Sequence, residues 1–206
     1  MNVELEFLEG DDLYPRVVLE TMLRAKANLW IAMANVKDCQ VEIRGRYRSI
    51  IDGFAALCRK GVEVRLLHSG VPSASFLGSL KESGLAGNRN FKMRRCGRVH
   101  FKAVLADDTH LHLGSANLTG AGLGAKSPKR RNFELGILTQ NPALIERVAQ
   151  LYHRIWEGLL CPDCGRRNVC YVPLEEPRED ESAKHAKRRE KTTERAFDHG
   201  LHGWHG

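Results

Sequence analysis

The chain has 206 residues, 42% of them hydrophobic, and a formal net charge of +7. This length suits one domain with an appendage, and the hydrophobic content is enough for a buried core. The longest apolar run, near residues 29–36, is far shorter than the about 20 residues that span a bilayer. The acidic, alternating start Met1–Glu6 lacks the features of a signal peptide. We therefore expect a cytoplasmic protein without stable membrane association.

Apolar periodicity predicts that strands and helices alternate along the chain. A two-residue period indicates strands, and apolar positions three or four apart indicate helices. This alternation predicts an α/β fold, a mixed β-sheet flanked by helices. The expected strands are 3–8, 28–34, 62–67, 91–94, 99–106, 110–114 and 133–139, and the expected helices are 11–27, 47–60, 76–82 and 142–156.

One segment, residues 100–117, carries the pattern H-x-K-x4-D-x6-G-S-x-N, once in the chain. On the expected strand 99–106, His100 and Lys102 share a face and lie about 7 Å apart. The turn residues after it, Asp107–Thr109, predict a hairpin that returns Gly114 and Ser115 toward His100. Asp107 lies in the turn, so we expect it to hold the turn or a neighbouring segment rather than touch substrate.

A histidine beside a lysine suits phosphodiester chemistry. The imidazole attacks phosphorus to form a phosphohistidine, and water then attacks that intermediate. Lys102, Ser115 and Asn117 can stabilise the charge that develops on the non-bridging oxygens. This route needs no catalytic metal or other cofactor.

The pattern resembles the phospholipase D superfamily, in its single-motif branch of small bacterial nucleases and Zucchini-like mitochondrial enzymes. The resemblance covers roughly residues 1–158 and implies a phospholipase D-like α/β sandwich. It also implies that Glu134, in Asn132-Phe133-Glu134, orients the nucleophilic histidine. The candidate catalytic residues are therefore His100, Lys102, Asp107, Ser115, Asn117 and Glu134.

The single copy of the motif predicts a dimer. In-line displacement needs an acid on the leaving-group side of phosphorus, and one histidine cannot stand on both sides. Pairing about a two-fold axis would supply a second His100. The histidines His110 and His112 are expected as polar residues on a half-exposed or interface-facing strand face, and His68 as a loop residue, each with a minor alternative of contact with the site.

Basic residues flank the motif in sequence and favour a polyanionic substrate. A third basic group is Arg44, Arg46 and Arg48. The loop 120–131 is either a backbone clamp or a mobile loop. The candidate nucleic-acid-binding residues are Arg94, Arg95, Arg98, Lys126, Lys129, Arg130 and Arg131.

Three cysteines follow the last expected helix. Cys161, Cys164 and Cys170 have the spacing C-x2-C-x5-C, which suggests a structural zinc site. A fourth ligand could come from His153, Cys39, Cys96 or a histidine of the tail, and a disulfide or plain thiols are the alternatives. We therefore expect a phosphodiesterase domain at 1–158, a cysteine-containing segment at 159–174 and a charged tail at 175–206, disordered or a solvated helix.

Three functions remain open from the sequence. The first is a metal-independent phosphodiesterase or endonuclease that cleaves DNA or RNA in a homodimer. The second is a phospholipase D-like hydrolase or transferase that acts on phospholipid. The third is a nucleic-acid-binding or assembly protein whose site is idle or depends on a partner.

Overall fold

A mixed seven-stranded sheet forms the centre of the protein in the computed structural model, which describes residues 4–170 and residue 174. The strands β2, β5 and β6 run parallel, and the other neighbouring pairs are antiparallel. The strands, in their order across the sheet, are β1 (Glu6–Glu9), β9 (Leu135–Thr139), β8 (His110–Gly114), β7 (Lys102–Ala106), β2 (Asn28–Met33), β5 (Glu63–His68) and β6 (Phe91–Arg95). The predicted fold class, a mixed sheet flanked by helices, is confirmed.

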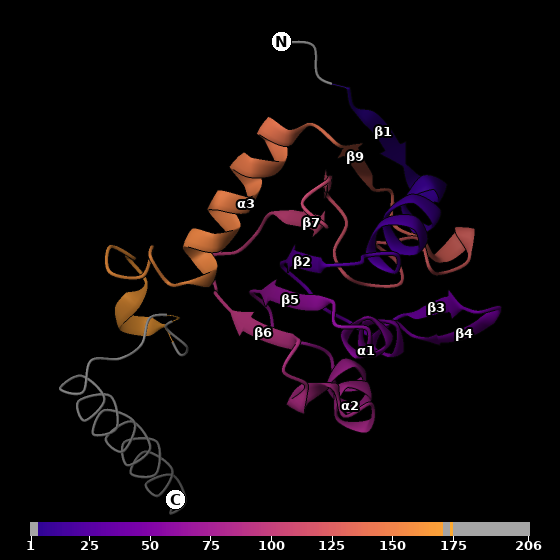
Figure 1. The fold of residues 1–206 in the computed structure, drawn as a ribbon, viewed down its shortest axis with the longest axis horizontal. Helices are drawn as coiled ribbons and strands as arrows, with labels where there is room; N and C mark the ends of the chain where they lie inside the picture. The colour runs from indigo at the N-terminus through magenta and orange to yellow at the C-terminus, as the bar shows by residue number, and fades with distance from the viewer. Residues whose placement is uncertain (1–3, 171–173, 175–206) are drawn as a thin grey trace, which may run out of the picture. The chain divides into compact units, whose positions relative to one another are not determined.

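Helices cover both faces of this sheet (Figure 1). One face packs against the π-helix η2 (Tyr14–Met22), α1 (Ile50–Arg59) and α2 (Ala74–Glu82), together with a separate hairpin of β3 (Gln40–Ile43) and β4 (Arg46–Ser49). The other face packs against α3 (Pro142–Trp156). The short 3-10 turns are η1 (Gly10–Asp12), η3 (Leu85–Gly87), η4 (Pro128–Arg130) and η5 (Arg167–Val169).

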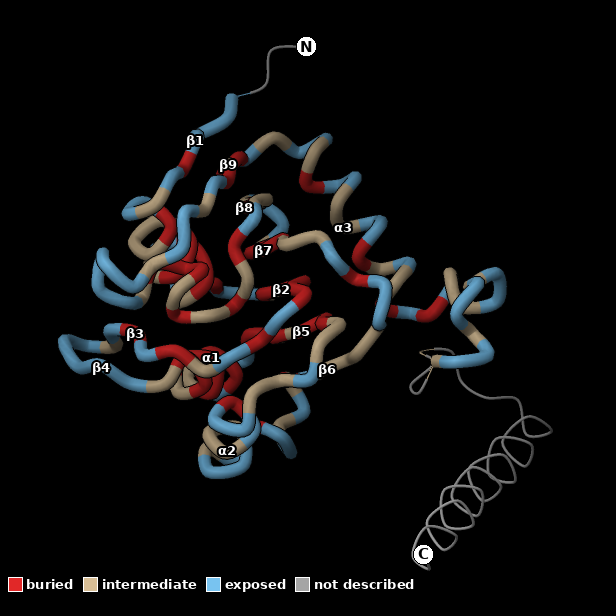
Figure 2. Tube along the Cα trace, turned by 180° about the vertical axis from the view of Figure 1, so that it is seen from behind, coloured by how far each residue is buried: buried red, intermediate tan, exposed pale blue. Residues whose placement is uncertain are grey.

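The core therefore consists of two apolar layers, one on each face of the sheet (Figure 2). On the α3 side, Trp30, Tyr152 and Trp156 stack with ring centroids 5.7 Å apart in each successive pair. The guanidinium of Arg65 lies over the Trp30 ring, 5.2 Å from its centroid. This stack fixes α3 against β2 and β5, because aromatic and cation–π contacts add to the burial of apolar area.

Side chains of the preceding residues cap the three α-helices. Ser49 accepts a hydrogen bond from the Ile51 N–H, Ser73 from the Phe76 N–H, and Asn141 from the Leu144 N–H. Such caps satisfy N–H groups that have no partner within the helix. The prediction for 142–156 matches α3 at both ends, as Asn141 and Pro142 together indicate its start.

Several predicted boundaries are wrong. The expected helix 11–27 is the short turn η1 followed by η2, which ends at Met22, and the strand expected at 99–106 begins only at Lys102. The helix expected at 47–60 starts at Ile50, because residues 46–49 form β4, a strand that the sequence analysis did not predict. The turn between β3 and β4 is Arg44-Gly45, with φ values of 53° and 72°. It replaces the Asn-Gly sequence that usually marks a two-residue hairpin turn.

The described residues of the segment 159–174 belong to the same compact unit as the sheet. The predicted charged tail, 175–206, and its histidine-rich end lie outside the described residues. Among the described residues, no helix combines the length and apolar character that crossing a bilayer requires.

Candidate active site

The motif residues gather at one end of the sheet because of its register. Lys102 at the start of β7 pairs with Gly114 at the end of β8, and Gly114 pairs in turn with Gly136 of β9. Ser115 therefore follows directly beside Lys102, and Glu134 directly precedes β9 at the same end. The chain after β2 also reaches this end, since Ala32 pairs with Ala103. Strand pairing thus brings together residues that are far apart in the sequence, such as Ala32 and Ala103.

His100 precedes β7 instead of lying on it, which corrects the predicted shared strand face. Its side chain is exposed and makes no hydrogen bond or ion pair with the described residues. The Lys102 ammonium donates a hydrogen bond to the His100 backbone carbonyl over 2.7 Å. The cation is therefore held at the His100 backbone, with two of its three N–H donors left for a phosphate.

Asn117 is oriented by a residue that the sequence analysis did not identify. Its side-chain Oδ1 accepts a hydrogen bond from the Asn35 backbone N–H over 2.9 Å. The two segments of the chain pair again nearby, through a β-bridge between Val36 and Leu118. Because Oδ1 is engaged, the Nδ2 donor of Asn117 faces away from Asn35, and it has no partner among the described residues. No sequence signal marks Asn35, since its contribution is a backbone group.

Ser115 and Glu134 form a pair at the mouth of the hairpin. The Ser115 hydroxyl donates to Glu134 Oε2 and accepts from the Leu135 N–H over 3.1 Å. Asn132 Nδ2 donates to the other carboxylate oxygen over 3.1 Å. Glu134 therefore holds Ser115, and it makes no hydrogen bond or ion pair with His100, the residue that the resemblance implies it orients.

Asp107 lies at the opposite end of β7, five residues or about 16 Å from Lys102. Its carboxylate accepts hydrogen bonds from the backbone N–H groups of Lys26, Ala27 and Asn28, at 2.7 to 3.2 Å. Asp107 and Asp108 both have positive φ, 56° and 55°. Asp107 thus ties the turn to the start of β2, and it is too far from His100 to touch a substrate there.

His112 is completely buried, so the expected half-exposed position is wrong. Its Nδ1 lies 3.1 Å from the Ile137 carbonyl oxygen, and burial lowers its pKa to about 4, which keeps the ring neutral at pH 7. The ring fills space that two glycines leave open: a Cβ added at Gly136 would lie 2.3 Å from His112 Cε1, and one at Gly114 would lie 3.1 Å from it. The imidazole therefore belongs to the packing beneath the site.

The other two histidines are also engaged. His68 is the last residue of β5 rather than a loop residue; it is buried, with Nδ1 2.8 Å from the Gly70 carbonyl oxygen. Its pKa is lowered, chiefly by burial and also by the nearby charge of Arg95. His110 is half-buried, and its two ring nitrogens lie 2.9 Å from Thr109 Oγ1 and 2.8 Å from Gln140 Nε2. His100 is the exposed one of these four.

The predicted nucleic-acid-binding residues divide into two groups. Four are tied into the fold: Arg94 donates to the Trp156 carbonyl, Arg95 to the Ser69 carbonyl over 2.9 Å, Arg98 to Cys164 Sγ over 3.6 Å, and Arg131 pairs with Asp11. The remaining three, Lys126, Lys129 and Arg130, are exposed, and their side chains have no partner among the described residues.

The loop that carries these free cations is partly packed. Leu123 is fully buried in the core, and a Cβ added at Gly122 would lie 2.7 Å from the Asn117 carbonyl oxygen. The Lys126 N–H donates to the Gly120 carbonyl over 2.9 Å, which closes this first part of the loop. The basic residues thus emerge from a fixed base next to Asn117.

The three C-terminal cysteines are not brought together. Within the described part of the chain, no three histidine, cysteine, aspartate or glutamate side chains stand close enough to hold a metal ion. Cys164 is close to Arg98, and the Arg166 N–H and the Arg98 guanidinium lower the pKa of its thiol. Of the fourth ligands considered, Cys39 is buried and His153 packs edge-on against Trp30, 4.5 Å between centroids. The zinc site stays a prediction.

Solved structures share this fold at low sequence identity. NucT from Helicobacter pylori superposes with a TM-score of 0.56 at 16% identity, covering 76% of this chain and 97% of its own. A phospholipase D family member, Nuc from Salmonella typhimurium, has a TM-score of 0.54 at 19% identity, covering 76% and 95%. A polyphosphate kinase from Porphyromonas gingivalis has a TM-score of 0.52 at 16% identity, covering 75% and 26%. No curated protein sequence matches the chain.

The sequence itself matches a family described as "Cardiolipin synthase, PLD-like domain" over residues 18–156. That range is more than half of the chain and contains every motif residue from His100 to Glu134. It also contains the strands whose pairing assembles the site. The motif, the fold and the sequence match agree, and the chain belongs to the phospholipase D-like family.

Proposed function

We propose that this protein is a metal-independent phosphodiesterase that cleaves nucleic acid through a phosphohistidine, at a site shared by two copies of the chain. The family and the fold support phosphodiester chemistry in general. One observation carries the proposal: a partner-free His100 lies beside the Lys102 ammonium, at the end of the sheet where Asn117 also offers a free donor.

In the proposed reaction, a His100 nitrogen attacks phosphorus while the bond to the leaving oxygen breaks. The His100 of the partner subunit gives a proton to that oxygen and then takes one from the water that cleaves the phosphorus–nitrogen bond. Lys102 and the Nδ2 group of Asn117 donate to the non-bridging oxygens, where negative charge increases in the transition state. Each proton and each bond is accounted for without a metal ion.

An exposed apolar surface beside the site supports pairing with a second copy. Phe133 and Leu135 flank Glu134 and are 107% and 53% exposed, and Phe7 on the neighbouring strand β1 is 61% exposed. Contiguous exposed apolar side chains of this size are typical of interaction surfaces. A two-fold axis through this surface would bring a second His100 toward the first.

Nucleic acid is favoured as substrate by the free cations Lys126, Lys129 and Arg130 on the loop after Asn117. Contacts of Lys and Arg with phosphates supply most of the nonspecific affinity for nucleic acid. Phospholipid is the second candidate, because the matching family carries the description of a cardiolipin synthase domain and lipid phosphodiesters present the same reacting group.

The test is cleavage of labelled single- and double-stranded DNA and RNA in excess EDTA, with phosphatidylglycerol vesicles as a parallel substrate. We expect cleavage of nucleic acid by wild type and a loss on the order of 10³-fold or more in His100→Ala. Cleavage that persists in His100→Ala would refute the mechanism. Turnover of the lipid alone would replace the proposed substrate by the second candidate.

A further inference from the structure

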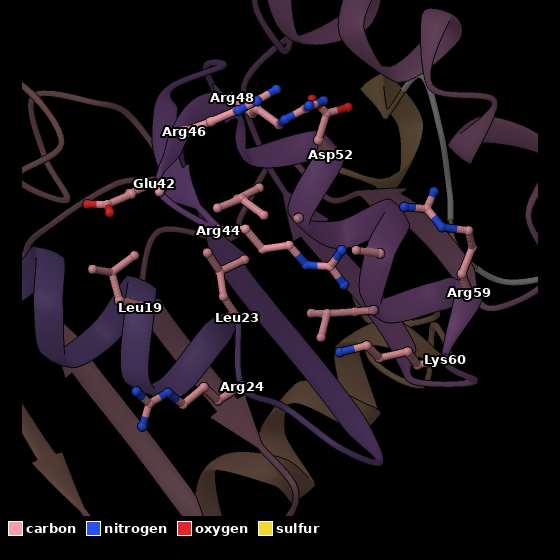
Figure 3. Close-up of a pocket in the computed structure, with 15 residues that line it drawn as sticks. Leu19, Leu23, Arg24, Glu42, Arg44, Arg46, Arg48, Asp52, Arg59 and Lys60 are labelled. Carbon is pink, nitrogen blue, oxygen red and sulfur yellow. The ribbon is translucent and has the colours of Figure 1, made fainter.

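A cavity of about 930 Å³ lies away from the motif, between η2, the β3–β4 hairpin and α1 (Figure 3). Its walls contain none of the candidate catalytic residues. The hairpin is anchored on both sides: the Glu42 N–H donates to Tyr14 Oη over 2.7 Å, and Ser49 Oγ donates to Asp38 over 2.7 Å. The lining residues are Leu19, Leu23, Arg24, Glu42, Ile43, Arg44, Gly45, Arg46, Arg48, Asp52, Gly53, Ala56, Leu57, Arg59 and Lys60.

Positive charge dominates this cavity. Its lining includes six cationic side chains but only two carboxylates, Glu42 and Asp52. All six cations are exposed, and none makes an ion pair or a side-chain hydrogen bond with the described residues. Elsewhere, by contrast, Arg16 pairs with Glu6 and Arg131 pairs with Asp11. The six cations are Arg24, Arg44, Arg46, Arg48, Arg59 and Lys60.

The cations surround the cavity instead of converging on one point. In Figure 3, Arg46 and Arg48 lie at one end, Arg24 at another, and Arg59 and Lys60 along a third side. Leu23 is part of an apolar floor and packs closely on α1, since a Cβ added at Gly53 would lie 2.6 Å from its Cδ2. Spaced cations around an apolar floor suit a chain of phosphates with sugars and bases between them, more than a single phosphate.

Arg44 stands at a position that its backbone disfavours. Its φ of 53°, followed by 72° at Gly45, gives the two-residue turn that Asn-Gly forms with less strain. The arginine is therefore not explained by the turn. Its side chain reaches across the middle of the cavity (Figure 3).

We propose that this cavity binds the phosphodiester backbone of single-stranded nucleic acid, as a second contact outside the active site. The inference rests on the proposed function, since it assigns this surface to the same substrate. Lys102 and the β3–β4 hairpin lie on the same face of the sheet. Lys102 and Val104 are two residues apart on β7, so their side chains point to the same face, and Val104 packs there in one apolar layer with Val41 of β3. A strand that leaves the active site could therefore continue over this face.

The test measures binding of a fluorescent 20-nucleotide single strand by anisotropy at several salt concentrations, with His100→Ala in every protein to prevent cleavage. The variant combines Arg44→Gln, Arg46→Gln and Arg48→Gln. We expect Kd to rise tenfold to a hundredfold near 0.1 M salt, and the slope of log K against log salt to fall by about 2, since each lost contact with a single strand removes about 0.7. Arg44→Asn alone should raise Kd while leaving the thermal midpoint equal or higher.

The matched control removes the same three charges from exposed positions of α2 and α3, with Lys81→Gln, Arg147→Gln and Arg154→Gln. Equal Kd values and slopes in the two triple variants would overturn the inference. So would a loss of binding to phosphatidylglycerol vesicles without a loss of binding to the oligonucleotide. Hydrolysis of bis-p-nitrophenyl phosphate by the cavity variant, with His100 present, should equal that of wild type. A wild type without nuclease activity would refute the proposed function and leave the binding result to decide this inference.

Discussion

Acidification should destabilise this protein through His112. The ring is neutral and fully buried in the folded state, with a pKa near 4 against the ordinary 6.5. Below pH 6.5 the unfolded chain binds a proton that the folded chain does not, so the free energy of unfolding falls as pH decreases toward 4. A shift of this size corresponds to about 3 kcal/mol, a large part of the stability of an ordinary domain.

Urea unfolding of wild type and His112→Asn at several pH values from 7.5 to 4 measures this contribution. Asparagine does not titrate, and its side-chain N–H stands where Nδ1 of the histidine stands, so it can donate to the Ile137 carbonyl without the charge change. Both proteins contain His68, whose pKa is also lowered, and the same carboxylates. The contributions of these groups to the pH dependence of stability therefore cancel when the two proteins are compared. We expect the stability advantage of wild type to shrink by about 3 kcal/mol between pH 7 and pH 4. Parallel stability curves would show that His112 does not titrate as its burial implies.

Three further changes test other parts of the structure. Asp107→Ala should lower the free energy of unfolding in urea by about 1 to 3 kcal/mol, because three backbone N–H groups lose their acceptor. The kcat of the variant should stay unchanged at temperatures where it is folded. A large fall in kcat would place Asp107 in the reaction. Gly136→Ala should destabilise the folded protein by about 1 to 3 kcal/mol, because the added Cβ would overlap the His112 ring. The control Gly78→Ala on α2, where the added Cβ meets nothing within 4 Å, should not destabilise it. Equal thermal midpoints for the two variants would contradict the packing of His112 against Gly136. Phe133→Asp should give a monomer in sedimentation velocity and inactive protein, because a charge would enter the proposed apolar interface; an active monomer would remove the shared site.

The β7–β8 hairpin could be predicted because its local signals agree. Alternating apolar residues on both sides of Asp107-Asp108-Thr109 indicate two strands and a turn, and aspartates tolerate the positive φ values observed there. The motif residues follow from this hairpin, since its register places Gly114 opposite Lys102. The segment 99–101 was wrongly assigned to the strand. The cause is tertiary: the last pair of β2 with β7 is Ala32 with Ala103, after which residue 101 has no partner strand.

The burial of His112 could not be predicted from alternation alone. A polar residue between Leu111 and Leu113 indicates a solvent-facing side, but β8 is a central strand covered on both faces, with Val104 and Leu138 as the neighbours of His112. The β3–β4 hairpin was missed for a local reason, because Arg44-Gly45 replaces the usual turn residues and Tyr47 of β4 stands three residues before Ile50, which continues the apolar spacing of α1. No side-chain pattern reveals the backbone N–H groups of Asn35 and Leu135, which donate hydrogen bonds to Asn117 and Ser115.

Mixing of subunits measures whether one active site needs His100 from two copies of the chain. Wild type and His100→Ala are coexpressed with different affinity tags, or unfolded together and refolded, and nuclease activity is measured against the fraction of wild-type chains. Activity should follow the square of this fraction, so that an equal mixture keeps about one quarter of the wild-type activity, because only dimers with two histidines turn over. Activity proportional to the wild-type fraction, about one half at equal mixing, would show that each chain acts alone and would contradict the shared site.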